Sequence, residues 1–150
     1  MKSLLAPAAL LLAVSCQVPT TDDQGAPAPT PEPSYQLQVH YLEIVTPEVD
    51  AMCAAYASAL GLDFGEPVME FGGARTADLP NGSRVGIRAP MRADEAPVVR
   101  PYWLVEDIDA AVAAAVAGGG EVAMPPMEIP GQGRFAIYLH GGIDHGLWQL

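Results

Sequence analysis

The chain has 150 residues, of which 18 are Asp or Glu and seven are Lys or Arg, so its formal net charge near neutral pH is −11. Half of the residues are apolar and 17% are charged, a balance typical of a folded core and not of a disordered chain. At this length one compact domain is expected. The acidic balance excludes the basic surface that phosphate backbones and anionic membranes require, so nucleic acid is not expected as a partner.

The N-terminal residues have the pattern of a secretory signal. Lys2 gives a short positive start, and residues 4–14 form an apolar run of eleven, which is too short to span a bilayer. The run ends in Ala13-Val14-Ser15-Cys16, which resembles the bacterial lipobox, with the usual leucine one place early at Leu12. The resemblance implies that residues 1–15 are removed, that Cys16 is lipidated and that the protein is exported to a bacterial cell envelope. Ordinary signal peptidase cleavage is the alternative.

Residues 17–34 are expected to join the lipidated Cys16 to the folded domain, so that residues 16–34 form anchor and linker. They contain five prolines, three acids and no aromatic residue, a composition that favours extended, solvated chain. Eighteen residues at about 3 Å each reach roughly 50 Å from a membrane. Cys53, the only other cysteine, lies in an alanine-rich helical pattern and is expected to be a small buried residue.

Residues 35–150 contain a weak internal repeat. Residues 49–61 align without a gap on residues 108–120, with five identical positions, and both segments are rich in alanine and end in glycine. This pattern predicts one helix in each half with a glycine stop at its C-terminal end. Runs rich in β-branched and aromatic residues precede the two helices, at 37–45 and 99–105, and predict strands.

Three shorter strand candidates follow each predicted helix. They are residues 63–70, 73–79 and 84–89 in the first half and residues 121–124, 134–139 and 146–150 in the second. Each half therefore has the order β-α-β-β-β, in modules of about 36–90 and 98–150. The predicted fold class is α+β.

The duplicated βαβββ pattern resembles a known superfamily. Together with Val49-Asp50 and Leu60-Gly61 around the first helix and the terminal Gly146-Leu147-Trp148-Gln149, it is similar to the vicinal oxygen chelate superfamily, also called the glyoxalase/bleomycin-resistance/dioxygenase superfamily, in its glyoxalase-like branch. The resemblance covers nearly all of residues 36–150. It implies a cupped mixed sheet whose two modules enclose a cavity, and a possible homodimer.

Enzymes of this superfamily typically hold a divalent ion with His, Glu or Gln from the first and last strands of each module. The equivalent positions here fall on Tyr41 and Arg100 in the first strands, and on Gly86, or its same-face neighbour Arg88, and Gly146 in the last strands. None of them is a carboxylate, and an arginine repels a nearby cation. We therefore expect no metal or other cofactor.

Histidines offer the only alternative for a metal. A turn one residue longer before the first helix puts His40 in the place of Tyr41, which makes His40 a weak candidate ligand. Because neighbouring strand residues face opposite ways, only one of the two is expected to face the cavity. His140 and His145 with Asp144 could form a different site, but both histidines are interpreted as exposed turn residues, since two histidines and one acid on a flexible loop lack a convergent scaffold.

The gapless alignment predicts which side chains line the cavity. Tyr41, Glu43 and Val45 face inward from the first module, and Arg100, Tyr102 and Leu104 face inward from the second. The ligand-binding candidates are Tyr41, Glu43, Arg100, Tyr102 and Trp148. In this interpretation Arg100 pairs with a ligand carboxylate and Glu43 accepts from an amine or hydroxyl. In the alternative, Glu43 and Arg100 neutralise each other as a structural ion pair, and the tyrosines are ordinary packing.

The sequence thus leaves three hypotheses for function. The first is a membrane-tethered, metal-independent module that binds a small amphipathic or aromatic molecule. The second is an enzyme of lyase, isomerase or dioxygenase type, which uses a divalent metal with His40 or a metal-free acid/base pair of Tyr41 and Glu43. The third is a structural or oligomerising envelope protein. No catalytic residue is assigned, and whether the chain is an enzyme stays open.

Overall fold

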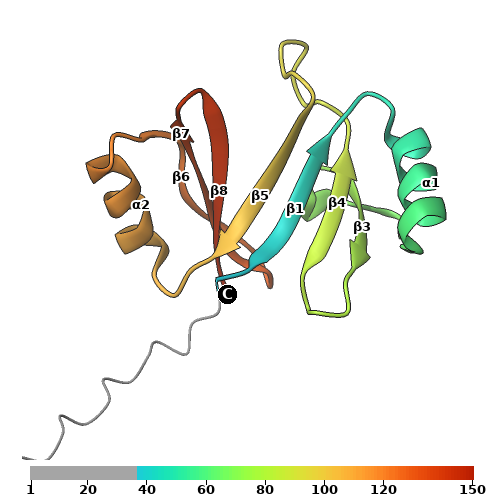
Figure 1. Ribbon diagram of the computed structural model, residues 1–150, viewed down its shortest axis with the longest axis horizontal. Coiled ribbons are helices and arrows are strands. Elements are labelled where there is room, and N and C mark those ends of the chain that lie inside the picture. The colour runs from blue at the N-terminus through green and yellow to red at the C-terminus, as the bar shows by residue number, and fades with distance from the viewer. Residues whose placement is uncertain (1–36) are drawn as a thin grey trace, which may run out of the picture. The chain divides into compact units, whose positions relative to one another are not determined.

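The computed structural model describes residues 37–150, which belong to one unit built on a single eight-stranded sheet (Figure 1). The predicted signal peptide, the lipidated Cys16 and the linker to residue 34 lie outside the described residues. Within the part that is described, neither helix has the length and apolarity needed to cross a membrane.

The chain runs through two modules of the same design. The first comprises β1 (Val39–Val45), α1 (Val49–Leu60), β2 (Pro67–Val68), the 3-10 helix η1 (Met69–Phe71), β3 (Ala74–Asp78) and β4 (Arg84–Arg88). The second comprises β5 (Val98–Leu104), α2 (Ile108–Ala117), β6 (Glu121–Ile129), β7 (Gly133–His140) and β8 (Ile143–Gln149). The predicted α+β fold of two βαβββ modules is therefore confirmed.

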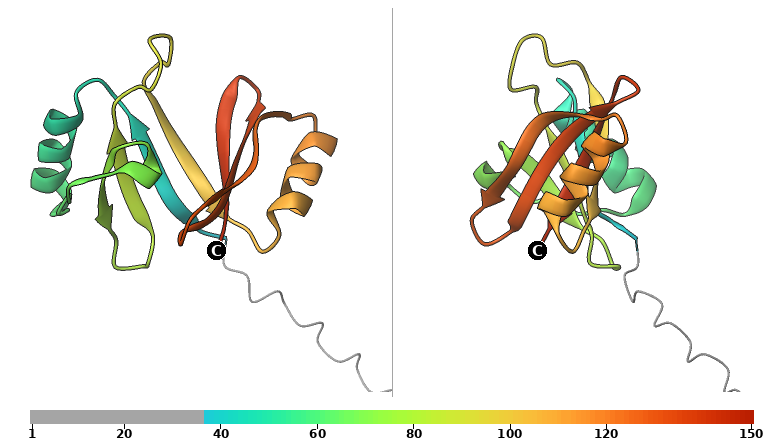
Figure 2. Two further views of the ribbon diagram at one scale, coloured as in Figure 1. Left: turned by 180° about the vertical axis from the view of Figure 1, so that it is seen from behind. Right: turned by 90° about the vertical axis from the view of Figure 1, so that its left-hand side faces the viewer.

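The two modules join through their first strands. The strand order is β2-β3-β4-β1-β5-β8-β7-β6, with β1 antiparallel to β5 at the centre. Each first strand is parallel to the last strand of its own module, β1 to β4 and β5 to β8. The sheet curls, and α1 and α2 lie on its outer side at opposite ends (Figure 2). The inner side of the curl is left for a site between the modules.

Alternation along the strands divides the core between these two sides. On β1, Tyr41 belongs to a cluster between the modules, whereas Leu42 and Ile44 pack with residues of α1. Cys53 of α1 is buried in the same cluster as Ile44, as expected. On β8, Trp148 faces the inner cluster and Leu147 packs under α2. Successive residues of a strand point to opposite faces of the sheet, and here both faces are covered.

The start of β1 departs from regular alternation. Its pairing with β5 shifts register between Val39 and Tyr41, which marks a β-bulge at His40. A bulge re-aims a side chain because two residues of one strand oppose one residue of its partner. As a result His40 and Tyr41 line the same cavity, and the expectation that only one of them could do so is wrong.

Two predicted strands have different lengths in the structure. Residues 63–70 contain only the short β2, since η1 follows directly and ends at Gly72, whose φ of 65° favours glycine. The strand predicted at 121–124 extends to Ile129 through two prolines. Proline is tolerated there because β6 is the edge of the sheet, where a missing N–H costs no ladder bond.

The segment with two histidines near the C-terminal end is not a flexible loop. It is a hairpin in which β7 and β8 are joined by Gly141 and Gly142, both with positive φ, as two-residue hairpin turns require. The ring of His145 stacks on Tyr138, with centroids 4.9 Å apart. His140 is exposed. The hairpin places Asp144 against Arg100 and His145 within β8, so the expectation of a flexible loop is wrong, whereas His140 is exposed beside the turn, as expected.

Candidate functional site

The five side chains predicted to bind a ligand lie together on the inner side of the sheet. The central register pairs Tyr41 with Tyr102 and Glu43 with Arg100 across β1 and β5. Trp148 of β8 packs against both tyrosines, with ring centroids 5.7 Å and 5.9 Å away. All five are buried. The structure thus brings the predicted set together, although proximity alone does not assign a ligand to it.

Glu43 is the centre of a buried ion network. Its Oε1 accepts a hydrogen bond from Nε of Arg88 at 2.6 Å. Its Oε2 accepts from Nη1 of Arg100 and, at 3.1 Å, from the hydroxyl of Tyr102. Glu43, Arg88 and Arg100 are 6%, 3% and 6% exposed. Charges this deep are tolerable because each is paired and hydrogen-bonded.

Two further carboxylates close the network at its outer ends. Nη2 of Arg100 donates to Asp144 at 2.6 Å. Arg88 donates from both Nη atoms to Glu95, at 3.0 Å and 2.7 Å. The two arginines therefore face three carboxylates, and both Nη atoms of Arg100 are occupied. The structural ion pair that the sequence allowed is present, and Arg100 has only its Nε without a partner among the described residues.

The sequence interpretation missed Glu95 and Asp144 as members of this network and named Arg88 only as an alternative metal-ligand position. Glu95 lies in the connection between the modules, where no periodicity indicates which way a side chain points. Asp144 was assigned to a flexible loop. The signal that could have found them is charge balance, because two arginines on the inner strands need more than one buried carboxylate.

Aromatic rings divide the space between the modules. Tyr41, Phe71 and Trp148 pack with centroids 5.2–6.0 Å apart and line cavities on both of their sides. One cavity, of about 130 Å³, is bordered by the ion network; we call it the Glu43 cavity. The other, of about 150 Å³, is bordered by His40 and Arg84; we call it the His40 cavity.

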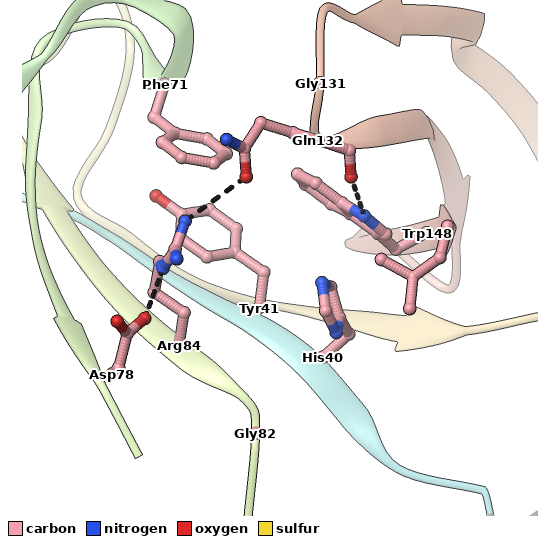
Figure 3. Close-up of a pocket in the computed structure, with 10 residues that line it drawn as sticks. His40, Tyr41, Phe71, Asp78, Gly82, Arg84, Gly131, Gln132 and Trp148 are labelled. Atoms are coloured by element: carbon pink, nitrogen blue, oxygen red, sulfur yellow. Dashed lines mark hydrogen bonds and ion pairs between the residues drawn. The ribbon is translucent and has the colours of Figure 1, made fainter.

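Figure 3 shows the His40 cavity. Arg84 donates from Nε to Asp78 at 2.6 Å and from Nη1 to Oε1 of Gln132 at 3.4 Å. The indole N–H of Trp148 donates to the backbone oxygen of Gln132 at 3.1 Å, which holds the turn between β6 and β7 across the opening. The hydroxyl of Tyr41 has no hydrogen-bond partner among the described residues, although Tyr41 is only 4% exposed.

Both tyrosines of the central pair lie over a glycine. A Cβ at Gly86 would stand 1.8 Å from the hydroxyl of Tyr41, and one at Gly146 would stand 2.4 Å from the ring of Tyr102. These glycines occupy the last-strand positions at which the family resemblance implies metal ligands. The rings therefore fill the space that ligand side chains would need.

The donor set does not fit a divalent ion. Among residues 37–150 no group of three His, Cys, Asp or Glu side chains is placed to hold one. Burial raises the pKa of the Tyr41 hydroxyl well above its ordinary value, as does nearby Glu43, so the phenol is neutral near pH 7. The Arg84 guanidinium beside His40 would repel a cation.

Burial sets the protonation of the other groups here. It lowers the pKa of His40 below 6.5, with a smaller contribution from the charge of Arg84, so that imidazole is neutral near pH 7. Burial also raises the pKa of Tyr102, followed by the charge of Glu43. Hydrogen bonds from Arg88 lower the pKa of Glu95 to about 2. The site thus holds charged carboxylates and guanidiniums beside neutral phenols and a neutral imidazole.

A curled sheet of two βαβββ modules that encloses aromatic-walled cavities defines a class of small-molecule domains, and the comparisons give its family. Residues 38–144 match the family model of the Glyoxalase/Bleomycin resistance protein/Dioxygenase superfamily. The chain belongs to this superfamily, which confirms the resemblance found in the sequence.

Two relatives and several solved structures are similar to the chain. The protein called "Putative glyoxylase CFP32" in Mycobacterium bovis and in Mycobacterium tuberculosis is 32% identical over 116 residues. The match covers 73% of this chain and 44% of either relative, so the chain spans less than half the length of these relatives.

Protein BH1468 from Bacillus halodurans C-125 superposes with a TM-score of 0.59 at 12% identity, covering 77% of this chain and 96% of that one. Methylmalonyl-CoA epimerase from Mycobacterium tuberculosis superposes with a TM-score of 0.56 at 18% identity, covering 75% and 86%. At these identities the structural likeness shows a shared fold.

Proposed function

We propose that residues 37–150 form a domain that binds a small amphipathic or aromatic molecule between its modules, without a resident metal. The observation that carries this proposal is a cavity of about 150 Å³ between the modules, which is walled by aromatic rings and bordered by His40 and Arg84. Pockets for small ligands combine apolar walls with a few polar groups that fix orientation.

The alternative is a metal-dependent enzyme of lyase, isomerase or dioxygenase type. It is supported by the family, by the name of the mycobacterial relatives and by the epimerases that share the fold. The donor chemistry supports binding without a metal, because His40 is a lone imidazole beside an arginine. A metal-free acid/base pair of Tyr41 and Glu43 has less support, since Glu43 is fully engaged and Tyr41 holds its proton firmly.

Elemental analysis of the purified full chain tests the choice between these two functions. The chain is expressed with iron, manganese, nickel and zinc present and is also measured by native mass spectrometry. We expect substoichiometric metal and a co-purified organic molecule or an empty cavity. Metal near one equivalent that is lost in His40→Ala would contradict the proposal and support the enzyme. The same spectra give the oligomeric state, where a homodimer remains a prediction.

We also propose that the domain is carried at the surface of a bacterial membrane by a lipid on Cys16. The support is the sequence pattern of residues 1–16 and the proline-rich composition that follows it. Fractionation of cells that express the full chain tests this proposal, with Cys16→Ser as the variant. We expect the wild type in the membrane fraction with a diacylated N-terminus by mass spectrometry, and the variant released from it.

A further inference from the structure

We propose that the His40 cavity binds a small aromatic carboxylate, with the carboxylate on Arg84 and the ring against Phe71 and Trp148. This inference rests on the proposed binding function and names its ligand class and its anchoring residue. It moves the anion away from Arg100, the arginine that the sequence favoured, because the structure shows the Nη atoms of that arginine already occupied by Glu43 and Asp144.

Arg84 is the guanidinium on the inner side that retains a free Nη group, whereas Arg100 keeps only its buried Nε without a partner among the described residues. Its Nε is paired with Asp78, a side chain that is 75% exposed, and its Nη1 makes one long bond of 3.4 Å to Gln132. Within residues 37–150, Nη2 makes no hydrogen bond. Ion pairs exposed to water are weak, whereas a carboxylate that binds a guanidinium with both oxygens is held firmly and in a fixed orientation.

Figure 3 shows the guanidinium of Arg84 between the hydroxyl of Tyr41 and the side chain of Gln132. That hydroxyl is buried over Gly86, and the phenol keeps its proton. The guanidinium is therefore the group that an anion in this cavity would contact.

The charges around the two cavities favour the His40 cavity for an anion. Its lining side chains carry one positive charge, on Arg84, and one negative charge, on the exposed Asp78. The Glu43 cavity is lined by Glu43 and Glu70 as well as by two arginines, and Glu95 and Asp144 lie directly behind those arginines. An added carboxylate would meet an excess of negative charge in the Glu43 cavity and an available cation in the His40 cavity.

The size and walls of the His40 cavity select a ring. Its volume is about 150 Å³, comparable to the apolar protein cavity that binds benzene. Phe71 and Trp148 form one side, and the guanidinium of Arg84 lies 5.5 Å from the centre of the Phe71 ring. Because Phe71 and Trp148 are themselves 6.0 Å apart, a ligand ring lies against this wall and not between the two side chains.

Three probes of the same shape and different charge test the proposal: benzoate, benzamide and benzylamine, titrated into the full chain by calorimetry. We expect benzoate to bind at least tenfold more tightly than benzamide, and benzylamine to bind most weakly. Arg84→Gln should remove the preference for benzoate and leave benzamide unchanged.

A matched variant shows whether a loss is specific. Arg75→Gln removes a guanidinium that pairs with Asp50 outside both cavities. It should not change benzoate affinity, and melting temperatures report whether each variant is folded.

Equal affinity for benzoate and benzamide, or a preference that survives Arg84→Gln, would overturn the assignment of the anion to Arg84 and leave the binding function standing. A preference that is lost in Arg100→Gln and kept in Arg84→Gln would place the anion in the Glu43 cavity, against the proposal. Failure of all three probes to bind would count against the binding function itself.

Discussion

Gly86 and Gly146 occupy equivalent places on the last strands of the two modules, and each leaves room for a tyrosine from the central pair of strands. Neither glycine has a positive φ, so neither is needed for a turn. They allow a ring to pack directly against the strand backbone, because the ring of Tyr41 or Tyr102 lies where a side chain would otherwise stand. At the scale of single residues, glycine on one strand thus determines which side chain of the neighbouring strand lines the site.

The first prediction is that Gly86→Ala destabilises the domain. The new Cβ would stand 1.8 Å from the hydroxyl of Tyr41, and the ring has no free direction because it packs against Phe71 and Trp148. We expect the free energy of unfolding to fall by about 2 kcal/mol, as in other overpacked cores. Urea denaturation measures it.

Two further variants serve as controls for this experiment. Gly65→Ala is the control, since its Cβ would meet only the backbone oxygen of Thr76 at an ordinary 3.9 Å. In a Tyr41→Ala background, Gly86→Ala should cost almost nothing, because the clash has been removed. An equal cost in both backgrounds would contradict the assignment of Tyr41 as the group that excludes a side chain at position 86.

At the scale of elements, the two modules repeat their topology without repeating its details. Asp107 caps the start of α2, since its side chain accepts a hydrogen bond from the N–H of Ala110 at 3.0 Å. Glu48 precedes α1 and makes no such side-chain hydrogen bond. The strand β1 begins with a bulge that brings His40 to the cavity. Local chemistry at the start of an element therefore distinguishes two halves that share one fold.

The second prediction compares the two helix starts. Asp107→Ala should lower the free energy of unfolding by about 1 kcal/mol, because the exposed start of α2 loses the acceptor for one of its free N–H groups. Glu48→Ala should change it by a few tenths at most. Thermal unfolding followed by circular dichroism checks both, and an equal loss in the two variants would mean that the cap of α2 contributes nothing.

At the scale of the whole domain, the ion network ties the modules and their connection together. Glu43 lies on β1, Arg88 on β4 and Arg100 on β5, while Glu95 belongs to the connecting segment and Asp144 to β8. The pairs Arg88–Glu43, Arg100–Glu43 and Arg100–Asp144 link segments that are distant in sequence, whereas Arg88 and Glu95 are seven residues apart. Because these charges are buried together, the protonation of one carboxylate affects the stability of the whole assembly.

The third prediction concerns acid stability. Arg88 lowers the pKa of Glu95 from an ordinary 4.5 to about 2 in the folded domain. A carboxyl whose folded pKa is depressed contributes stability that is present above pH 4.5 and is lost as the pH falls toward 2. We expect Glu95→Gln to lower the free energy of unfolding at pH 7 by about 3 kcal/mol and to flatten its decline between pH 4.5 and 2.

Denaturation across this range of pH measures the effect. Glu121→Gln, at the exposed start of β6, is the matched control and should leave the acid limb of the curve unchanged. An unchanged acid limb in Glu95→Gln as well would mean that the pair of Arg88 and Glu95 does not contribute to acid sensitivity.

The sequence by itself indicated the two modules, five of the inner side chains and, through a resemblance, the family. The modules and the inward-facing positions follow from helix and strand periodicity and from a repeat, which act over neighbouring positions and can be read without a structure. Only the tertiary structure decided which arginine has an Nη group free to bind a ligand. Arg100 and Arg84 are both arginines on inner strands, and what separates them is that Asp144 and Glu43 reach the first while a water-exposed Asp78 pairs with the second. Ion pairing in three dimensions depends on long side chains that meet across the fold, and no local pattern encodes those meetings.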